Sequence, residues 1–122
     1  MISLAIIGAR AFDDYEFLSL EVKKQCIIWN IELKDINVIV GGHCKGADLL
    51  GEKFAGENKI KTLVLKPDWK KYGKSAGFRR NHDIVQSSSH IIAFPSQTGS
   101  GTQHSIKLAQ KLGIPCHVVV FD

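Results

Sequence analysis

The sequence predicts an α/β fold built around a doubly wound, five-stranded parallel sheet with helices on both faces. Five short apolar runs alternate with segments whose apolar residues recur at helical spacing, and parallel neighbouring strands require crossover connections of this kind. Small glycine-bearing loops follow the first, second and fourth runs, which places these loops near the switch in strand order and predicts the order 3-2-1-4-5. A chain of 122 residues is too short for two independent domains, so we expect one domain over residues 1–122.

The first strand and the first helix follow from apolar spacing and a capping pattern. Residues 2–7 form a near-continuous apolar run that ends at Gly8, as in a parallel strand covered on both faces. Asp13 and Glu16 resemble the capping pair of a helix start. Apolar residues then recur at helical spacing, at Tyr15, Leu18, Val22, Cys26 and Trp29.

The middle of the chain predicts two further strands. Residues 36–40 form a β-branched run, and a helical face up to Asn58 follows it, made by Ala47, Leu50 and Phe54. Residues 62–65 form the third strand. Pro67, Asp68 and Trp69 then predict an irregular connection, because proline and the neighbouring basic residues do not continue a sheet.

The last third of the chain completes the alternation. We expect a helix from about residue 75 to residue 86, a fourth strand over residues 90–94 and a helix that starts near Gly101. Gly113 followed by Pro115 ends that helix in the usual order. We expect residues 116–121 to form the fifth strand.

The composition indicates an intracellular protein without a metal. No apolar run approaches the roughly 20 residues of a membrane helix, and no charged leader precedes the first apolar run, so we expect a cytoplasmic protein with no membrane partner. The cysteines, with no C-x-x-C pair, favour neither disulfides nor zinc; they are Cys26, Cys44 and Cys116. We expect no metal and no cofactor. Cys44 stands between His43 and Lys45, and residues of these types lower the pKa of a nearby thiol. No further residue that would orient such a nucleophile is identifiable.

One segment concentrates the positive charge. This segment runs from Lys59 to Arg80 and contains one acidic residue, Asp68. Its basic residues are Lys59, Lys61, Lys66, Lys70, Lys71, Lys74, Arg79 and Arg80. Such a segment attracts anions, whether phosphates, nucleotides or a nucleic-acid backbone. A solvated lysine surface is the alternative.

Three loops carry the pattern of an anion site. They span residues 8–10, 41–46 and 99–102, and the carboxyl ends of parallel strands meet at one edge. Glycines let backbone N–H groups approach a phosphate closely, and the helix that starts near Gly101 adds its positive end and the Thr102 hydroxyl. Each loop alone is also compatible with a tight turn. Neither the P-loop pattern nor G-x-G-x-x-G fits these loops.

Several polar and aromatic residues lie where a ligand could meet them. Arg10 and Arg80 can pair with phosphate, and Asp48 can accept from ribose hydroxyls or be stabilised by its own helix dipole. Trp69 can stack on a base or cover the core. The residues predicted to bind the ligand are Gly8, Arg10, Gly41, Gly42, Lys45, Gly46, Asp48, Trp69, Arg80, Asn81, Gly99, Ser100, Gly101 and Thr102.

The order and spacing of several short motifs resemble a known family. They are Gly8-x-Arg10 with Phe12 and Asp13, the run from Val40 to Asp48, Pro67-Asp68-Trp69, Gly77-x-x-Arg80-Asn81, and Ala93-Phe94-Pro95 before Gly101-Thr102. The chain resembles the YspA-type branch of the SLOG superfamily, which also includes the DprA/Smf proteins and the LOG enzymes. The resemblance spans nearly the whole chain. It implies a Rossmann-like sheet and a pocket for nucleotides or their derivatives, including ADP-ribose-like signals.

The resemblance to LOG enzymes breaks at one position. Those enzymes cleave nucleoside monophosphates with an arginine, which Arg80 matches, and with the glutamate of P-G-G-x-G-T-x-x-E, where this chain has Ser105. We therefore expect a module that binds a small nucleotide-type ligand without hydrolysing it. Two alternatives remain: hydrolysis of an N-glycosidic or phosphate-ester bond, with Asp48, Asp68 and Arg80 as candidate catalytic residues, and binding of single-stranded nucleic acid. A homo-oligomer is compatible with the sequence.

Overall fold

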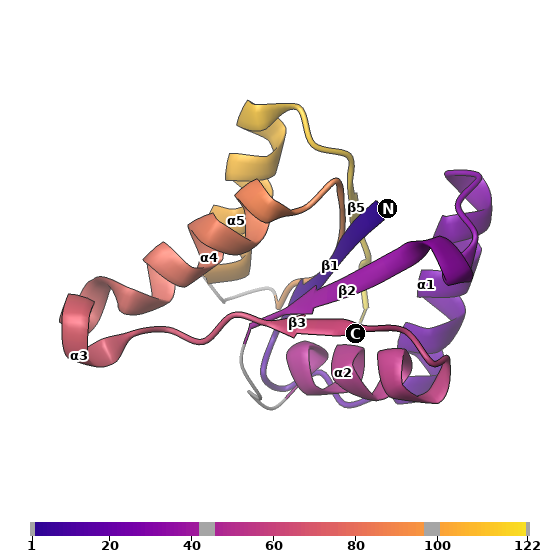
Figure 1. The fold of residues 1–122 in the computed structure, drawn as a ribbon, viewed down its shortest axis with the longest axis horizontal. Helices are drawn as coiled ribbons and strands as arrows, with labels where there is room; N and C mark the ends of the chain where they lie inside the picture. The colour runs from indigo at the N-terminus through magenta and orange to yellow at the C-terminus, as the bar shows by residue number, and fades with distance from the viewer. Residues whose placement is uncertain (1, 42–45, 97–100, 122) are drawn as a thin grey trace.

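The computed structural model describes residues 2–41, 46–96 and 101–121. Its centre is a five-stranded sheet in the order β3-β2-β1-β4-β5, and every neighbouring pair is parallel, which confirms the predicted fold and strand order (Figure 1). The strands are β1 (Ile2–Gly8), β2 (Ile36–Val40), β3 (Thr62–Val64), β4 (His90–Phe94) and β5 (Cys116–Val118). The strand order reverses between β1 and β4, where Gly8 pairs with Phe94.

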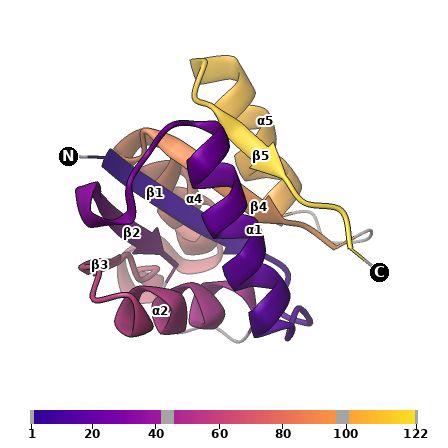
Figure 2. The ribbon, with the colours of Figure 1, turned by 90° about the vertical axis from the view of Figure 1, so that its right-hand side faces the viewer.

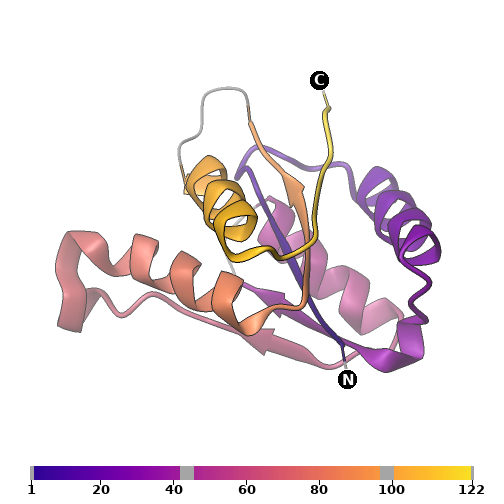
Figure 3. The ribbon, with the colours of Figure 1, turned by 90° about the horizontal axis from the view of Figure 1, so that it is seen from above.

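Helices cover both faces of the sheet. They are α1 (Tyr15–Ile28), α2 (Ala47–Glu57), α3 (Trp69–Tyr72), α4 (Ala76–Ser87) and α5 (Gly101–Leu112), with short 3₁₀ turns at Leu33–Asp35 and Gly73–Ser75. Figure 3 shows α1 and α2 on one side of the sheet and α4 and α5 on the other, and in Figure 2 α1 lies in front of the strands. No helix among the described residues is long and apolar enough to cross a membrane.

Alternating residues of β1 supply the two halves of the core. Leu4 and Ile6 belong to the cluster that packs under α1 and α2. Ala5 and Ile7 belong to the cluster under α4 and α5. Successive side chains of a strand point to opposite faces, so a central strand covered on both faces needs an unbroken apolar run. This requirement explains why the first strand could be identified from the sequence.

The cap of α1 corrects one local prediction. Asp14, not Asp13, precedes the helix, and its Oδ1 accepts a hydrogen bond from the backbone N–H of Phe17 at 3.1 Å. Two aspartates stand side by side at this point, and either can fill a cap position. The spacing of Asp13 and Glu16 therefore matched the capping pattern one residue too early.

Two further elements differ from their predicted bounds. The connection after β3 is not wholly irregular, because Asp68 caps the short helix α3 by accepting from the backbone N–H of Lys71 at 3.1 Å. The fifth strand ends at Val118 rather than at Phe121. The backbone N–H of Val119 still donates to the carbonyl of Ala93 at 2.8 Å, beyond the assigned strand. The chain leaves the sheet where β4 itself ends.

Candidate functional site

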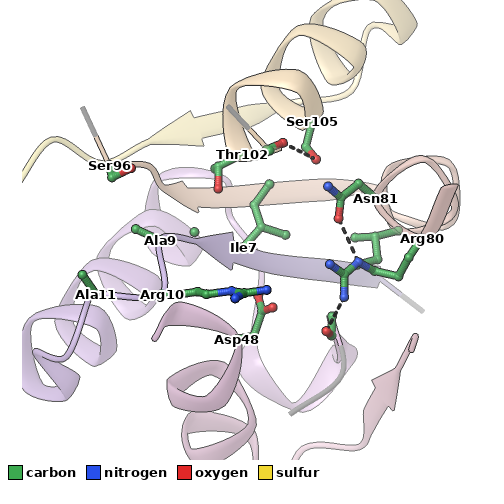
Figure 4. A pocket seen from close by; sticks show the side chains of 14 residues that line it. Ile7, Ala9, Arg10, Ala11, Asp48, Arg80, Asn81, Ser96, Thr102 and Ser105 are labelled. Carbon is green, nitrogen blue, oxygen red and sulfur yellow. Dashed lines mark hydrogen bonds between the residues drawn. The ribbon is translucent and has the colours of Figure 1, made fainter. Parts of the chain in front are cut away.

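A pocket of about 470 Å³ opens at the carboxyl edge of the sheet, where the strand order reverses. The ends of β1 and β2, the residues after β4, the first turns of α2 and α5 and the middle of α4 surround it (Figure 4). Eight residues predicted to bind the ligand line it: Gly8, Arg10, Gly41, Asp48, Arg80, Asn81, Gly101 and Thr102. Crevices of doubly wound sheets bind ligands at this position, because connections from neighbouring strands diverge there.

Two glycines bring the connection after β1 against the start of α2. A Cβ on Gly8 would lie 2.8 Å from Ala47 Cβ and 2.9 Å from Phe94 Cβ, closer than real Cβ atoms approach. Gly46 has a φ of +89°, which suits glycine, and a Cβ there would collide with the carbonyl oxygen of Ala9. That same oxygen accepts from the backbone N–H of Ala47 at 3.2 Å. The floor of the pocket is therefore held by backbone contacts between β1 and α2.

Arg80 reaches from α4 to the end of β2. Its Nη1 donates to the carbonyl of Gly41, and its Nε donates to Asn81 Oδ1 at 2.8 Å, as the dashed lines in Figure 4 show. A Cβ on Gly41 would lie 2.9 Å from Asp48 Oδ2 and 3.0 Å from Arg80 Nη1. The absence of a side chain at Gly41 thus makes room for both charged groups. Arg80 is held in a defined position at the pocket wall.

Asp48 supplies a carboxylate in the first turn of α2. Its pKa is raised from 3.8 to about 6; burial is the largest cause, Arg80 and Arg10 lower the pKa, and the neighbouring Glu52 raises it. Desolvation outweighs both cations because the carboxylate loses hydration on several sides. At neutral pH the group is mostly ionised but close to its titration range. It can therefore accept hydrogen bonds from hydroxyl groups and can exchange a proton with a bound ligand.

Arg10 is the second cation of the pocket. Its side chain is exposed and extends across the opening toward Asp48 (Figure 4). Electrostatic attraction from Arg10 is one of the influences that lower the Asp48 pKa. Two guanidinium groups against one carboxylate leave the described lining net positive. Such a lining attracts anions, and guanidinium groups suit phosphate oxygens in particular.

The beginning of α5 adds backbone donors on the opposite wall. Gly101 and Thr102 lie in the first turn of this 12-residue helix and line the pocket. The first N–H groups of a helix have no partner within it, and the helix dipole favours negative charge there. Ser105 is buried, and its hydroxyl donates to the carbonyl of Gly101 at 3.4 Å. Ser105, the residue that the resemblance aligns with the LOG glutamate, is therefore a short side chain that bonds to its own helix.

Three of the predicted site residues that the structure describes do not line the pocket: Gly46 directly before α2, and Trp69 and Asp68 at α3. Trp69 does not line the pocket; its side chain is 57% exposed on α3, and its Cη2 would lie 3.7 Å from a Cβ on Gly77. Asp68 caps the same short helix. Figure 1 shows α3 at the outer end of α4, away from the sheet edge. Trp69 and Asp68 therefore lie away from the pocket because of the position of α3. Their place in the sequence, after the third strand, did not indicate this separation.

Four other predicted residues, Gly42, Lys45, Gly99 and Ser100, lie outside the described residues. The structure adds residues that sequence reasoning did not single out, namely Ile7, Ala9, Ala11, Ile84 and Ser96. Ser96 follows Pro95 directly after β4, so its place at the carboxyl end of a strand was the available signal. Ile7 and Ile84 also belong to the core, so their apolar pattern gave no sign of a second role.

Three comparisons relate the chain to known proteins. The family described as "YspA, cpYpsA-related SLOG family" matches residues 3–72. The Gene 61 protein of Mycobacterium phage D29 is 34% identical over 84 residues, which are 64% of this chain and 67% of that protein. DprA from Streptococcus pneumoniae superposes on all of this chain with a TM-score of 0.77 at 16% identity, and DprA from Helicobacter pylori on 99% of it with a TM-score of 0.73 at 18% identity.

The two DprA structures share the fold and are longer. This chain spans 51% of the S. pneumoniae protein and 66% of the H. pylori protein, whose structure is described as showing a single-stranded DNA binding mode. The family match runs from β1 to α3 and includes seven residues that line the pocket, among them Gly8, Arg10, Gly41 and Asp48. It covers more than half of the chain and confirms the family that the motif order had indicated, over a shorter range than those motifs span. The chain belongs to the YspA, cpYpsA-related SLOG family.

Proposed function

We propose that the pocket binds the phosphate and ribose of a nucleotide or of a nucleotide-derived ligand such as ADP-ribose. The observation that carries this proposal is the convergence of two guanidinium groups and the start of α5 on a pocket at the switch in strand order. A phosphate fits between Thr102 and the two arginines, Arg10 and Arg80, because it accepts hydrogen bonds from backbone N–H, hydroxyl and guanidinium groups alike. Asp48 then accepts from the ribose hydroxyls.

The lining favours binding over hydrolysis. Departure of a base from ribose builds positive charge on the sugar, which a nearby carboxylate stabilises. Ser105 carries no such charge, and loss of one well-placed electrostatic group slows a reaction by about a hundredfold to a thousandfold. Asp48 is the one carboxylate among the described residues that line the pocket. The alternative of an N-glycosidic or phosphate-ester hydrolase therefore depends on Asp48 as its acid or base.

The test is a thermal-shift panel of nucleoside mono- and diphosphates, cyclic dinucleotides and ADP-ribose, with release of free base followed in parallel. A ligand at a hundred times its Kd stabilises the fold by about 2.7 kcal/mol. We expect stabilisation at micromolar concentration, loss of most of it in Arg80→Ala, and no base release. Robust base release that Asp48→Asn abolishes would establish the hydrolase instead, and absence of any shift would overturn the proposal.

Arg79→Ala is the matched control for Arg80→Ala. The two arginines are neighbours in α4, but the Arg79 guanidinium lies 4.3 Å from the Tyr72 ring centroid and its Nε donates to Ser75. Arg79 does not line the pocket. Equal loss of binding in both variants would show that general positive charge, and not the pocket, holds the ligand.

A second candidate function rests on the surface around α3. Trp69 and Phe78 are 57% and 51% exposed, and beside them lie exposed cations: Lys70, Lys71, Lys74 and Arg79. Exposed aromatic rings among cations are typical of surfaces that bind single-stranded nucleic acid. The H. pylori protein of the same fold is described as binding single-stranded DNA. We propose this surface as the place where such a strand would bind.

The two functions differ in their dependence on salt and on ligand length. If the surface binds single-stranded nucleic acid, the affinity should rise with oligonucleotide length and fall steeply with salt concentration. Trp69→Ala should weaken this binding. Lys24→Gln on α1 is a control, since it removes an exposed cation far from α3 in sequence. Unchanged binding in Trp69→Ala would contradict this second candidate and leave the pocket proposal intact.

A further inference from the structure

A second cavity, of about 440 Å³, is lined by the connection between β1 and α1 and by residues 120–121. Ala11 lines both this cavity and the first pocket. Ala11 is exposed. Apart from glycine, alanine has the smallest side chain, so Ala11 forms only a low barrier between the two spaces. A ligand held in the first pocket can therefore extend past Ala11 into the second cavity.

Aromatic rings form the inner wall of this second cavity. Phe12 is buried, and its ring stacks on Phe94 at a centroid distance of 4.8 Å. Phe121 meets Phe12 edge to face at 4.7 Å, and Phe17 lies 6.3 Å from it. Rings that pack against one another in this way have fixed orientations and present an apolar surface. Phe12, Phe17 and Phe121 all line the cavity, so a planar ring finds a rigid partner there.

The polar lining of the second cavity is acidic. Asp14 already accepts the capping hydrogen bond from Phe17, whereas Asp13 is exposed and lines the cavity without a role in the cap. An ionised carboxylate accepts hydrogen bonds and donates none. It therefore fits a ring that carries N–H donors, such as the exocyclic amino group of adenine, guanine or cytosine.

The charges of the two cavities orient the ligand. Arginines line the first pocket, at Arg10 and Arg80, and aspartates line the second, at Asp13 and Asp14. A phosphate is attracted to the first and repelled by the second. A base with amino groups carries no negative charge and can stack on the phenylalanine wall. The alternative orientation would place the phosphate beside two carboxylates.

We propose that the second cavity is the base subsite of the ligand pocket and that it selects bases with an exocyclic amino group. The phosphate and ribose lie in the first pocket, the ligand crosses Ala11, and the base lies against the phenylalanine wall with its amino group on Asp13. This proposal rests on the proposed function, because the phosphate fixes where the base can reach.

The experiment is isothermal titration calorimetry with ribose 5-phosphate, AMP, GMP, CMP, IMP and UMP. Wild-type protein is expected to bind at least one amino-bearing nucleotide about tenfold more tightly than its partner without that group (AMP or GMP against IMP, CMP against UMP) and more tightly than ribose 5-phosphate. Asp13→Asn should bring the paired affinities close together. Ala11→Leu should weaken the preferred nucleotide about tenfold more than it weakens ribose 5-phosphate, because the larger side chain blocks the passage to the second cavity.

One control variant and two distinct outcomes separate this proposal from the proposed function. Asp35→Asn removes an exposed carboxylate from the turn before β2, at the amino edge of the sheet, and should change no affinity. Equal affinities for ribose 5-phosphate and all nucleotides, with Ala11→Leu silent, would overturn the base subsite and leave the phosphate pocket standing. Failure of every compound to bind the wild-type protein would overturn both. Since Ala11 and Asp13 are exposed, a thermal melt suffices to confirm that both variants fold.

Discussion

Replacing Asp48 with asparagine is expected to stabilise the protein above pH 6. Burial raises the pKa of this carboxyl from 3.8 to about 6, so the folded state favours the protonated form. The ionised form at pH 7 then costs folding free energy, and the pKa difference corresponds to an upper limit of roughly 3 kcal/mol, at about 1.4 kcal/mol for each pH unit. Asparagine keeps the shape of the side chain and is never ionised.

The pH dependence of this effect has a definite sign. Below about pH 4 the carboxyl is protonated in both the folded and the unfolded chain, so wild type and Asp48→Asn should have the same free energy of unfolding, apart from the change of chemical group. Between about pH 4 and pH 6 the folded state binds more protons, so wild-type stability falls relative to the variant as the pH rises. Above about pH 6 the difference should reach its plateau.

Urea unfolding of both proteins from pH 4.5 to pH 8 measures this difference. Asp35→Asn, at an exposed position, serves as the matched control and should show no plateau. A variant that is no more stable than wild type at pH 7.5, or a difference that does not change with pH, would refute the reasoning. Because Asp48 is also the proposed ribose contact, the stabilised variant should bind nucleotides more weakly, so gain of stability and loss of affinity should come from one substitution.

Three further predictions concern neighbouring positions. Gly41→Ala should cost about 1–3 kcal/mol of stability and weaken anion binding, because its Cβ would crowd Asp48 and Arg80; an unaltered urea midpoint would contradict this. Glu52→Gln should move the midpoint of the Asp48 titration below about pH 6, since the Glu52 charge raises that pKa; a midpoint that stays put in an NMR titration would argue against it. Asp68→Ala should cost about 1 kcal/mol by loss of the α3 cap, seen as faster amide exchange at Lys71, while nucleotide affinity stays the same.

The sheet could be predicted because its signals are short in range. The apolar run of β1 indicates burial on both faces of the sheet. The glycines after the strands indicate a close approach of the backbone. Both signals are local in the sequence. The meeting of Gly8, Gly41 and Gly101 at one pocket followed from parallel topology alone. Arg80 also lines the pocket as predicted, because the second turn of α4 lies at the same edge.

The parts that could not be predicted depend on direction and on tertiary contact. The direction of the Trp69 side chain is set by the four-residue helix α3. The sequence predicted only an irregular, proline-containing connection at this place. The choice of Asp14 over Asp13 as cap depends on where the chain turns, because both side chains have the same chemistry. The raised pKa of Asp48 arises from the packing of α2, α4 and β2, and no sequence pattern records it.

The crowding around Gly41 has a consequence for how this family can vary. Three residues meet at this junction: Gly41 directly after β2, Asp48 of α2 and Arg80 of α4. Asp48 Oδ2 and Arg80 Nη1 lie within about 3 Å of the place where a Cβ on Gly41 would stand. A residue larger than glycine at position 41 requires a shorter or displaced side chain at position 48 or 80. Loss of Arg80 leaves Asp48 without a counter-charge that lowers its pKa. Among homologous sequences these three positions are therefore expected to change together, as a correlated set, rather than one at a time.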